Sequence, residues 1–473
     1  MHTQLAVLGG GPGGYAAAFM AADLGLDVTI LDERASLGGT CLIEGCIPSK
    51  MLLHVTAAMH DAESVADWGV RYARPNLDMA QMRGHKADVI ANLAAGLAQL
   101  AKSRGVRVVA ARGRFTASDA LALSPCGDAA LDDDVLSFDH CVVATGSVPV
   151  RLPNLPYDSP RLLDSTAALR LQDVPASLLV VGGGYIGLEL GSVYAALGSH
   201  VSLVEYTDGL LPGVDRDLVR PLLSRTKQTF ASLRFGAKVT TAVDRGEDIE
   251  VTIASRDEIF VETYDQVLVS VGRRPRTDDL GLETTQVQFD EHGFVRVDAQ
   301  RRTDDRRIFA VGDVTGQPML AHKASAEGRV AAEAIAGSDA EFAPRAIPCV
   351  VFTDPQIAWT GLTEAEAKTA GIKVSVTRFP WAASGRAQAV GRTDGVTKMI
   401  VDAESDRVLG VGVTGPAAGE MIAEAVLAIE MGATSADLGR AIHPHPTFSE
   451  TIATAAHMQH GTATEIYRPK RQR

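Results

Sequence analysis

The chain has 473 residues, of which 46% are hydrophobic and 22% are charged. This balance is typical of globular proteins and excludes an extensively disordered or fibrous chain, and the length allows about three domains. The formal net charge of −13 argues against nucleic acid as a partner, because a polyanion requires a basic surface. The short basic run 468–473 is expected to be a solvated tail.

The first uncharged stretch, from Leu5 to Ala22, is long enough to suggest a membrane span. It contains Pro12 and a group of glycines that a helix facing lipid would not tolerate, and residues 1–4 supply no basic start for a secretory signal. The five cysteines are too few and too scattered for the disulfide framework of a small secreted protein. The sequence therefore predicts a cytoplasmic protein with no membrane partner.

The most informative feature is an internal repeat in which residues 5–33 align with residues 178–206. Each copy contains an apolar strand, a glycine-rich turn, an alanine-rich helix and a second strand that ends in a carboxylate, Asp32 or Glu205. This pattern is typical of a βαβ unit that binds a dinucleotide. Its glycines allow a tight turn, close approach of a pyrophosphate and close packing of helix on strand; they are Gly9, Gly11 and Gly14, and Gly182, Gly184 and Gly187.

Each helix start offers unpaired N–H groups and a positive dipole end to phosphates, and each terminal acid can accept hydrogen bonds from the adenosine ribose. A single glycine turn of this kind is weak support, but two copies with matching strands and acids favour two dinucleotide sites. Residues 206–210, after Glu205, include no basic side chain that could bind a 2′-phosphate. The second unit is therefore expected to bind NAD rather than NADP.

Directly after the first unit, the segment GGTCLIEGCIPSK (38–50) contains Cys41 and Cys46. In a regular α-helix this spacing places the Cα atoms about 8.6 Å apart, beyond the roughly 7 Å that a disulfide can bridge. A bond would require a distorted helix, which Gly45 and Pro48 favour, and a strained bridge is easily reduced. Two inert thiols are the alternative, but the position beside a dinucleotide unit favours a redox pair. The cysteines without this context are expected to be packing residues: Cys126, Cys141 and Cys349.

Segments 140–149, 266–275 and 307–316 are predicted to be strands that close the two units, and each ends in a glycine turn. From about residue 345 the pattern changes. It predicts a strand over 350–359, a capped helix over 362–371, a hairpin over 398–415 and an apolar helix over 420–432. This part has no nucleotide fingerprint, so we expect it to contact a partner or to complete a substrate site.

Four segments together resemble the pyridine nucleotide disulfide reductase family: GGTCLIEGCIPSK, GGGYIGLELG, AVGDVTGQPMLAHKA (310–324) and HPHPTFSE (443–450). Within that family the dihydrolipoamide dehydrogenases are the most similar branch, and the similarity runs in order from Leu5 to beyond Glu450. Two positions depart from the family pattern: Ile43-Glu44 replaces the more usual Asn-Val, and Pro444 replaces alanine. The first leaves the cysteine spacing intact, and the second could alter substrate entry.

The resemblance implies an α/β fold with two Rossmann-like domains, for FAD and NAD, and a C-terminal α+β dimerisation domain. The expected boundaries are 1–148 for the FAD domain, 149–274 for the NAD domain, 275–344 for a central segment that returns to the FAD domain, and 345–473 for the interface domain. It also implies tightly but non-covalently bound FAD, NAD, no metal and a homodimer. The implied substrate is the lipoyl domain of an acyltransferase subunit in a multienzyme 2-oxo acid dehydrogenase complex.

The resemblance also implies roles for the residues of the redox segment. Cys41 would form the mixed disulfide with substrate, while Cys46 would lie nearest the flavin. Lys50 and Glu189 would form an ion pair beside the reactive nitrogen of the flavin. The implied cycle is ping-pong: dihydrolipoamide reduces the disulfide, the electrons pass to FAD, and hydride passes to NAD.

His445 and Glu450 match the family's base pair, in which the carboxylate orients the imidazole. A base is needed because a thiol must lose its proton before it can attack a disulfide, and histidine titrates in the working pH range. Pro446 restricts the backbone of His445 to extended conformations. The resemblance places His445 in the active site of the neighbouring subunit and assigns no role to His443.

The resemblance assigns further positions to cofactor contacts, in addition to Lys50. Among them, Tyr185 would cover the flavin until nicotinamide arrives. The rest are Gly39, Thr40, Gly113, Thr145, Gly146, Val239, Gly272, Arg273, Gly312, Asp313, Met319, Leu320, Ala321 and His322.

Related functions would require other sequence features. A glutathione-reductase-like enzyme would need basic residues near 206–211 for NADPH, and a mercuric-reductase-like enzyme would need a cysteine pair near the C-terminus, whereas no cysteine follows Cys349. An NADH diaphorase that makes no use of the thiols and a scaffold subunit without flavin are the remaining alternatives.

Overall fold

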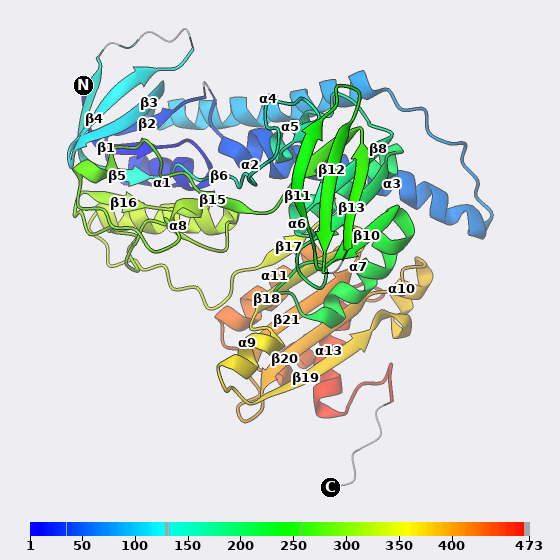
Figure 1. Cartoon of the computed structure of the whole chain (residues 1–473). Coiled ribbons are helices and arrows are strands. Elements are labelled where there is room, and N and C mark those ends of the chain that lie inside the picture. Colours follow the sequence, from blue (N-terminus) through cyan, green and yellow to red (C-terminus); the bar gives the residue numbers. More distant parts are fainter. Residues whose placement is uncertain (35, 128–130, 132, 257, 468–473) are drawn as a thin grey trace.

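The structure is a computed structural model that describes residues 1–34, 36–127, 131, 133–256 and 258–467; the predicted basic tail lies outside these residues. Figure 1 shows two α/β lobes, each built around one copy of the repeat, and a C-terminal antiparallel sheet that packs on the second lobe. Among the described residues, no helix is both long enough and apolar enough to cross a membrane.

The first lobe contains a six-stranded sheet in the order β1-β2-β3-β4-β5-β16, in which β1 also pairs with β5. β16 lies parallel to β5, so a segment far along the chain returns to this sheet. Every residue of β2 is buried, which explains its continuous apolar pattern. The strands are β1 (His2–Leu8), β2 (Val28–Asp32), β3 (Arg107–Ala117), β4 (Ala120–Pro125), β5 (Val135–Val143) and β16 (Ile308–Ala310).

Two helices of the first lobe, α1 (Pro12–Asp23) and α8 (Ala321–Ile335), approach each other closely. A side chain at Gly328 would place its Cβ 2.3 Å from the carbonyl oxygen of Gly13, so only glycine permits this approach. The other helical elements of this lobe are α2 (Gly39–Glu44), α3 (Cys46–Ser64), η1 (Val65–Trp68), α4 (Met79–Ser103), η2 (Leu282–Thr284) and η3 (Gly312–Thr315).

The second lobe contains a parallel sheet in the order β10-β9-β8-β14-β7 and an antiparallel sheet of β11, β12 and β13. Where the chain passes between the lobes, β6 and β15 pair in antiparallel fashion. The elements are β6 (Ser147–Pro149), β7 (Leu162–Leu163), α5 (Ser165–Arg170), β8 (Ser177–Val181), α6 (Tyr185–Leu197), β9 (His200–Glu205), α7 (Arg216–Thr229), β10 (Ser232–Phe235), β11 (Ala237–Asp244), β12 (Ile249–Ser255), β13 (Glu258–Tyr264), β14 (Gln266–Val269) and β15 (Arg273–Pro275).

The C-terminal part contains a five-stranded antiparallel sheet in the order β17-β18-β21-β20-β19. Its strands are β17 (Cys349–Val351), β18 (Gln356–Gly361), β19 (Val374–Pro380), β20 (Val396–Asp402) and β21 (Val408–Gly415). Its helical elements are α9 (Glu364–Thr369), η4 (Trp381–Ala383), α10 (Gly385–Ala389), α11 (Ala418–Glu430), α12 (Ser435–Arg440) and α13 (Glu450–His460).

Some predicted elements differ in extent from the observed ones. The single strand expected over 350–359 is wrong, because β17 and β18 are separate and Pro355, which has no N–H to donate, lies between them. The strands expected over 140–149 and 266–275 also divide, each at its glycine turn. The hairpin over 398–415 is confirmed as β20 and β21, and the helix over 362–371 is shorter and begins with a capping box formed by Thr363 and Glu366.

Candidate functional site

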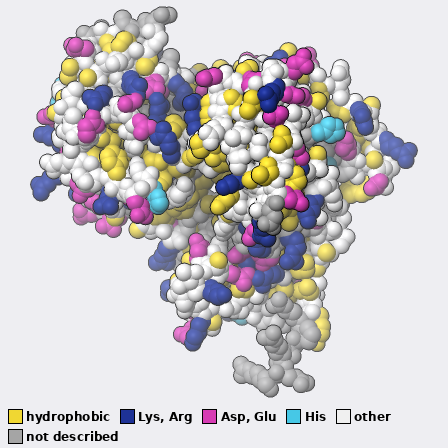
Figure 2. Space-filling model, in the orientation of Figure 1, with side chains coloured by type: hydrophobic (Ala, Val, Ile, Leu, Met, Phe, Trp, Pro, Cys, Tyr) yellow, Lys and Arg dark blue, Asp and Glu magenta, His cyan; other side chains and the backbone are white. Residues whose placement is uncertain are grey.

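A cavity of about 310 Å³ opens between the two lobes, within the size range of small-molecule sites. Figure 2 shows the lobes as separate masses with a hollow between them, and on this face the cationic and acidic side chains are interspersed. The lining comes from the glycine-rich turn after β1, the redox segment, the first half of α6 and the loop around η3.

The glycine-rich turn after β1 forms one wall of the cavity. α1 begins here with Gly11 at its N-cap and without a cap from any described side chain, so the positive end of the helix faces the cavity. The carboxylate of Asp32 accepts hydrogen bonds from the N–H groups of Gly10 at 2.6 Å and Arg34 at 2.7 Å. The acid therefore holds the turn in shape beside a site suited to phosphates.

Cys41 and Cys46 both line the cavity, and they lie on different helices, α2 and α3. Gly45 between them has φ −144° and ψ −109°, and a Cβ at this position would lie 2.8 Å from the carbonyl oxygen of Thr40. The distortion predicted for this segment is therefore confirmed, and it falls at Gly45. Both cysteines are free thiols, so the structure represents the reduced form of the pair.

A hydrogen bond between the two thiols shifts their pKa values in opposite directions. The hydrogen bond from Cys41 lowers the pKa of Cys46 to about 7, and the nearby charge of Lys50 acts in the same direction. The same hydrogen bond, together with burial, raises the pKa of Cys41. The first proton that the pair loses therefore leaves a thiolate centred on Cys46.

Lys50 and Glu189 meet across the cavity from different lobes. The Nζ of Lys50 lies 2.7 Å from Oε2 of Glu189, whose side chain is only 4% exposed. The other carboxylate oxygen accepts a 2.9 Å hydrogen bond from the N–H of Phe352, and the Phe352 ring centroid lies 4.8 Å from the Lys50 ammonium. Phe352 follows β17, so all three parts of the chain meet at this ion pair. Sequence reasoning missed Phe352, because an apolar residue beside a strand carries no chemical signature.

Polar side chains also fix the loop around η3. Ser147 Oγ donates to Asp313 at 2.5 Å and accepts from Arg273 Nε at 2.7 Å. The N–H of Gly312 donates to the carboxylate of Glu327 at 2.7 Å. Glu327 is fully buried and was also missed, because it lies just beyond the motif over 310–324. Two cations pair with it: Arg301 at 2.9 Å and Lys323 at 3.0 Å.

The turn of the second unit repeats the first, but its glycines lie outside the cavity lining that the described residues form, whereas Tyr185 and Ile186 belong to it. The N–H of Gly183 donates to Glu205 at 2.6 Å, and Thr207 donates to the same carboxylate through its N–H at 2.7 Å and its hydroxyl at 2.6 Å. A Cβ at Gly184 would meet no described atom within 4 Å. This turn is therefore open to a ligand from the surface.

His445 and Glu450 form the expected pair, with Nδ1 and Oε1 2.7 Å apart. Glu450 also accepts the N–H of Thr447 at 2.6 Å. The imidazole is 78% exposed and lies outside the cavity lining of the described part of its own chain. His443 instead contacts Glu424 at 2.8 Å, with a side chain that is 9% exposed, so it is a packed residue.

The structure brings together most of the predicted cofactor contacts. Those that line the cavity are Gly9, Gly11, Asp32, Gly39, Thr40, Lys50, Gly113, Thr145, Gly146, Tyr185, Arg273, Gly312, Asp313, Met319 and Ala321. Those outside the lining formed by the described residues are Gly14, Gly182, Gly184, Gly187, Glu205, Val239, Gly272, Leu320 and His322. His322 Nε2 instead contacts the carbonyl oxygen of Pro348 at 2.8 Å.

Comparison with known families gives two matches. Residues 3–328 match the pyridine nucleotide-disulphide oxidoreductase family, and residues 347–456 match the dimerisation domain of that family. The chain belongs to the pyridine nucleotide-disulphide oxidoreductase family. Membership confirms the expected fold class, implies FAD and NAD as cofactors, and supports a homodimer.

Individual relatives agree with this assignment. The dihydrolipoyl dehydrogenase of Vibrio parahaemolyticus is 44% identical, over 98% of this chain and 97% of its own. Dihydrolipoyl dehydrogenase 2 of Haloarcula marismortui is also 44% identical, over 98% and 97%. Among solved structures, LpdA from Mycobacterium tuberculosis is 27% identical with a TM-score of 0.88, covering 97% of this chain and 99% of that one. The HOCl-induced flavoprotein disulfide reductase RclA from Escherichia coli is 26% identical with a TM-score of 0.84, covering 96% and 99%.

The residues of the cavity fit the FAD that the family implies. The uncapped start of α1 suits its pyrophosphate, and the carboxylate of Asp32 suits the adenosine ribose. At the other end, the thiols and the ion pair of Lys50 with Glu189 lie where a redox ring would have to be placed to exchange electrons with sulfur.

Proposed function

We propose that the chain is a dihydrolipoyl dehydrogenase, which oxidises dihydrolipoamide to lipoamide and reduces NAD. The observation that carries this proposal is the thiol pair of Cys41 and Cys46 in the wall of the cavity that also contains Lys50 and Glu189. Relatives that are 44% identical over nearly the whole chain have this name, which supports the same substrate. Bound FAD would supply the two-electron relay between the thiols and NAD.

In the proposed reaction the cysteines begin as a disulfide. One thiolate of dihydrolipoamide attacks Cys41, and the bond to Cys46 breaks so that Cys46 leaves as a thiolate. The second substrate thiol then attacks the mixed disulfide, which releases lipoamide and the Cys41 thiol. The pKa of Cys46, lowered to about 7, makes it the better leaving group. Both cysteines are then in the reduced state that the structure represents.

We propose that His445 accepts the proton of the substrate thiol and that Glu450 orients it. The 2.7 Å contact with Glu450 keeps the proton of the neutral imidazole on Nδ1 and leaves Nε2 as the acceptor. Because the imidazole is exposed and lies outside the cavity lining formed by the described residues of its own chain, we propose that it serves the cavity of the partner subunit.

We propose the lipoyl domain of an acyltransferase subunit, in a 2-oxo acid dehydrogenase complex, as the protein that carries the substrate. We also propose a cytoplasmic location, because the five cysteines are too few and too scattered for the disulfide framework of a secreted protein. The pairing of β6 with β15 supports the proposed limits of the NAD domain, 149–274, because it lies where the chain enters and leaves the second lobe.

The first test is an assay of NAD reduction by dihydrolipoamide with the purified holoprotein, with NADP and glutathione as comparison substrates. We expect turnover with NAD and dihydrolipoamide, because the carboxylate of Glu205 disfavours a 2′-phosphate and residues 206–210 include no basic side chain. A strong preference for NADP and glutathione would overturn the substrate assignment and leave the family membership intact.

The second test separates the proposed enzyme from a diaphorase. Cys46→Ala should abolish lipoamide turnover and preserve the reduction of quinones by NADH. Cys126→Ala, the same change at a cysteine that lies outside the cavity lining formed by the described residues, should preserve both activities. In an anaerobic titration the wild-type protein should take up twice as many electrons per flavin as Cys46→Ala. Equal uptake would show that the cysteines do not store electrons.

A further inference from the structure

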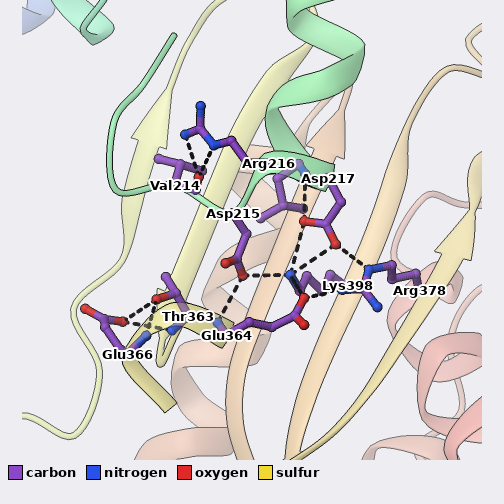
Figure 3. Close-up of polar contacts among 10 residues, drawn as sticks. Val214, Asp215, Arg216, Asp217, Thr363, Glu364, Glu366, Arg378 and Lys398 are labelled. Atoms are coloured by element: carbon purple, nitrogen blue, oxygen red, sulfur yellow. Dashed lines mark hydrogen bonds and ion pairs between the residues drawn. The ribbon is translucent and has the colours of Figure 1, made fainter. Parts of the chain in front are cut away.

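An ion-pair network lies between α7 of the second lobe and the C-terminal sheet (Figure 3). At its centre is Lys398 on β20, whose side chain is 1% exposed. Its Nζ lies 2.7 Å from Asp215 and 3.1 Å from Asp217, and it also contacts Glu364. Arg378 on β19 pairs with Asp217 and Glu364. The ammonium therefore lies among three carboxylates whose oxygen atoms are close together and offsets their charge.

The network favours the charged forms of Lys398 and Asp217. Burial by itself would lower the pKa of Lys398, but hydrogen bonds to Asp215, Glu364 and Asp217 outweigh it and raise that pKa. Burial would raise the pKa of Asp217, but hydrogen bonds from Arg378 and Lys398 hold it below its ordinary value. Removing one member would leave an unpaired buried charge, which is much more costly than losing an exposed ion pair.

The start of α7 is fixed to the C-terminal sheet by packing as well. The hydroxyl of Thr414 on β21 donates to the carbonyl oxygen of Leu218 at 2.7 Å. Gly412 faces the Leu218 side chain so closely that a Cβ there would lie 2.3 Å from Cδ1. The C-terminal sheet therefore determines where the first turn of α7 lies.

Arg216 lies between the two aspartates of the network and extends away from Lys398, toward the loop that joins β9 to α7 (Figure 3). Its guanidinium donates to carbonyl oxygens of this loop: Leu210 at 2.7 Å, Leu211 at 2.5 Å and Val214 at 2.6 and 3.0 Å. One side chain thus bonds three carbonyl groups in the second half of loop 206–214.

The loop in turn contacts the dinucleotide-binding turn. The N–H of Leu211 donates to the carbonyl oxygen of Gly183 at 2.9 Å, and the N–H of Gly183 donates to Glu205 at 2.6 Å. The buried network is therefore connected to the glycine-rich turn of the second unit, first through the chain at Arg216 and then through the hydrogen bonds of Arg216 and Leu211.

Arg216 also bears on the choice between NAD and NADP. It lies close to the loop that follows the ribose-binding acid, since a Cβ at Gly209 would be 3.2 Å from its Nη1. Its nitrogen atoms already donate to backbone carbonyls, so the guanidinium is committed to the loop and not to a 2′-phosphate.

We propose that the Lys398 network positions the NAD site: it fixes α7 so that Arg216 holds loop 206–214 against the glycine-rich turn, and it thereby sets both the affinity for NAD and the rejection of NADP. Lys398 and Arg216 are positioning residues, because they act on the turn through the loop. The inference rests on NAD as the ligand of the second unit and adds the residues that tune its recognition.

The test compares Lys398→Met, Arg216→Ala and the double variant as FAD-loaded proteins. Calorimetry with NAD⁺ and NADP⁺ on the oxidised proteins measures binding without turnover. Each single substitution is expected to weaken NAD⁺ binding about tenfold and to reduce the ratio of the affinity for NAD⁺ to that for NADP⁺. The FAD content should stay unchanged. Both residues act through the same loop. The affinity of the double variant for NAD⁺ should therefore equal that of whichever single variant binds NAD⁺ less tightly.

Glu262→Gln is the matched control, since it breaks another ion pair of the second lobe, with Arg234 at 2.6 Å, and should leave NAD⁺ binding unchanged. Three outcomes would overturn the inference. They are unchanged NAD⁺ binding in both single variants, a loss of binding free energy in the double variant equal to the sum of the two single losses, and a loss of NAD⁺ affinity in Glu262→Gln as large as in the test variants. If Lys398→Met does not fold, Asp217→Asn tests the same link, and Lys398→Arg should bind NAD⁺ better than Asp217→Asn. A wild-type protein that prefers NADP⁺ would overturn the proposed function itself.

Discussion

The two dinucleotide units have nearly the same turn but different surroundings. In each unit the N–H of the second turn glycine donates to the terminal acid at 2.6 Å: Gly10 to Asp32, and Gly183 to Glu205. The first glycine of each turn has a positive φ, 103° at Gly9 and 110° at Gly182, which favours glycine over any other residue. The repeated sequence thus builds one local geometry twice.

The surroundings of the turns differ. In the first unit α8 packs on α1, and a Cβ at Gly13 would lie 3.0 Å from Val311. The equivalent position in the second unit is Ile186, and the turn there is open at Gly184. An enclosed site suits a cofactor that stays bound, whereas an open site suits one that exchanges in each cycle. The same fingerprint therefore serves either purpose, according to what packs around it.

The largest effect should come from the third glycine of each turn. A Cβ would lie 1.8 Å from a carbonyl oxygen at Gly14 and 2.2 Å from one at Gly187, so neither helix can keep its place. We expect Gly14→Ala to lose FAD, and Gly187→Ala to retain FAD but bind NAD at least about 100-fold more weakly. Flavin absorbance and calorimetry measure the two losses. Gly84→Ala, with open space around it, is the control, and full FAD retention by Gly14→Ala would contradict the comparison.

A smaller effect, on kcat, is expected from the ion pair of Lys50 with Glu189, where the lobes meet. Glu189→Gln removes the negative partner of Lys50 and keeps an acceptor for the N–H of Phe352. We expect kcat to fall about tenfold with little change in FAD content, because the Lys50 ammonium is then no longer held in place. Glu283→Gln, which breaks an exposed pair with Arg114, should leave kcat unchanged. A kcat at the wild-type level in Glu189→Gln would rule out a contribution of this ion pair.

The acidity of the thiols gives the next effect. In the reduced protein, alkylation of Cys46 by iodoacetamide should accelerate as the pH rises through about 7, because the thiolate is the nucleophile. Lys50→Met should move this midpoint upward, since the cation that lowers the pKa of Cys46 is lost. Peptide mapping identifies the modified residue, and preferential alkylation of Cys41 would contradict the assignment.

The smallest expected effect is on the pH dependence of stability. It comes from His60 on α3, where the two lobes meet. Burial and the charge of Arg225 on α7 lower the pKa of His60 from its ordinary value near 6.5. Below that pH the unfolded chain binds a proton that the folded chain does not, so this group reduces stability as the pH falls. His60→Gln should therefore flatten the decline in Tm between neutral pH and about pH 5. An unchanged decline would show that other groups cause it.

Much of the site could be predicted because it is built from short segments. The Gly45 break, which separates the helices of Cys41 and Cys46, follows from residues that are close together in the sequence. What could not be predicted came from distant segments. Phe352 donates to Glu189 across 163 positions, and the contact of Glu327 with Gly312 requires two elements to fold against each other.

The sequence alone determined the two glycine turns, their acids and the thiol pair, because steric rules and charge act there over a few residues. Only the tertiary structure decided which turn is enclosed and which is open, how Phe352 completes the Lys50 pair, and how Lys398 reaches the second unit. These contacts join parts of the chain that no local pattern relates, since they depend on the packing of whole domains.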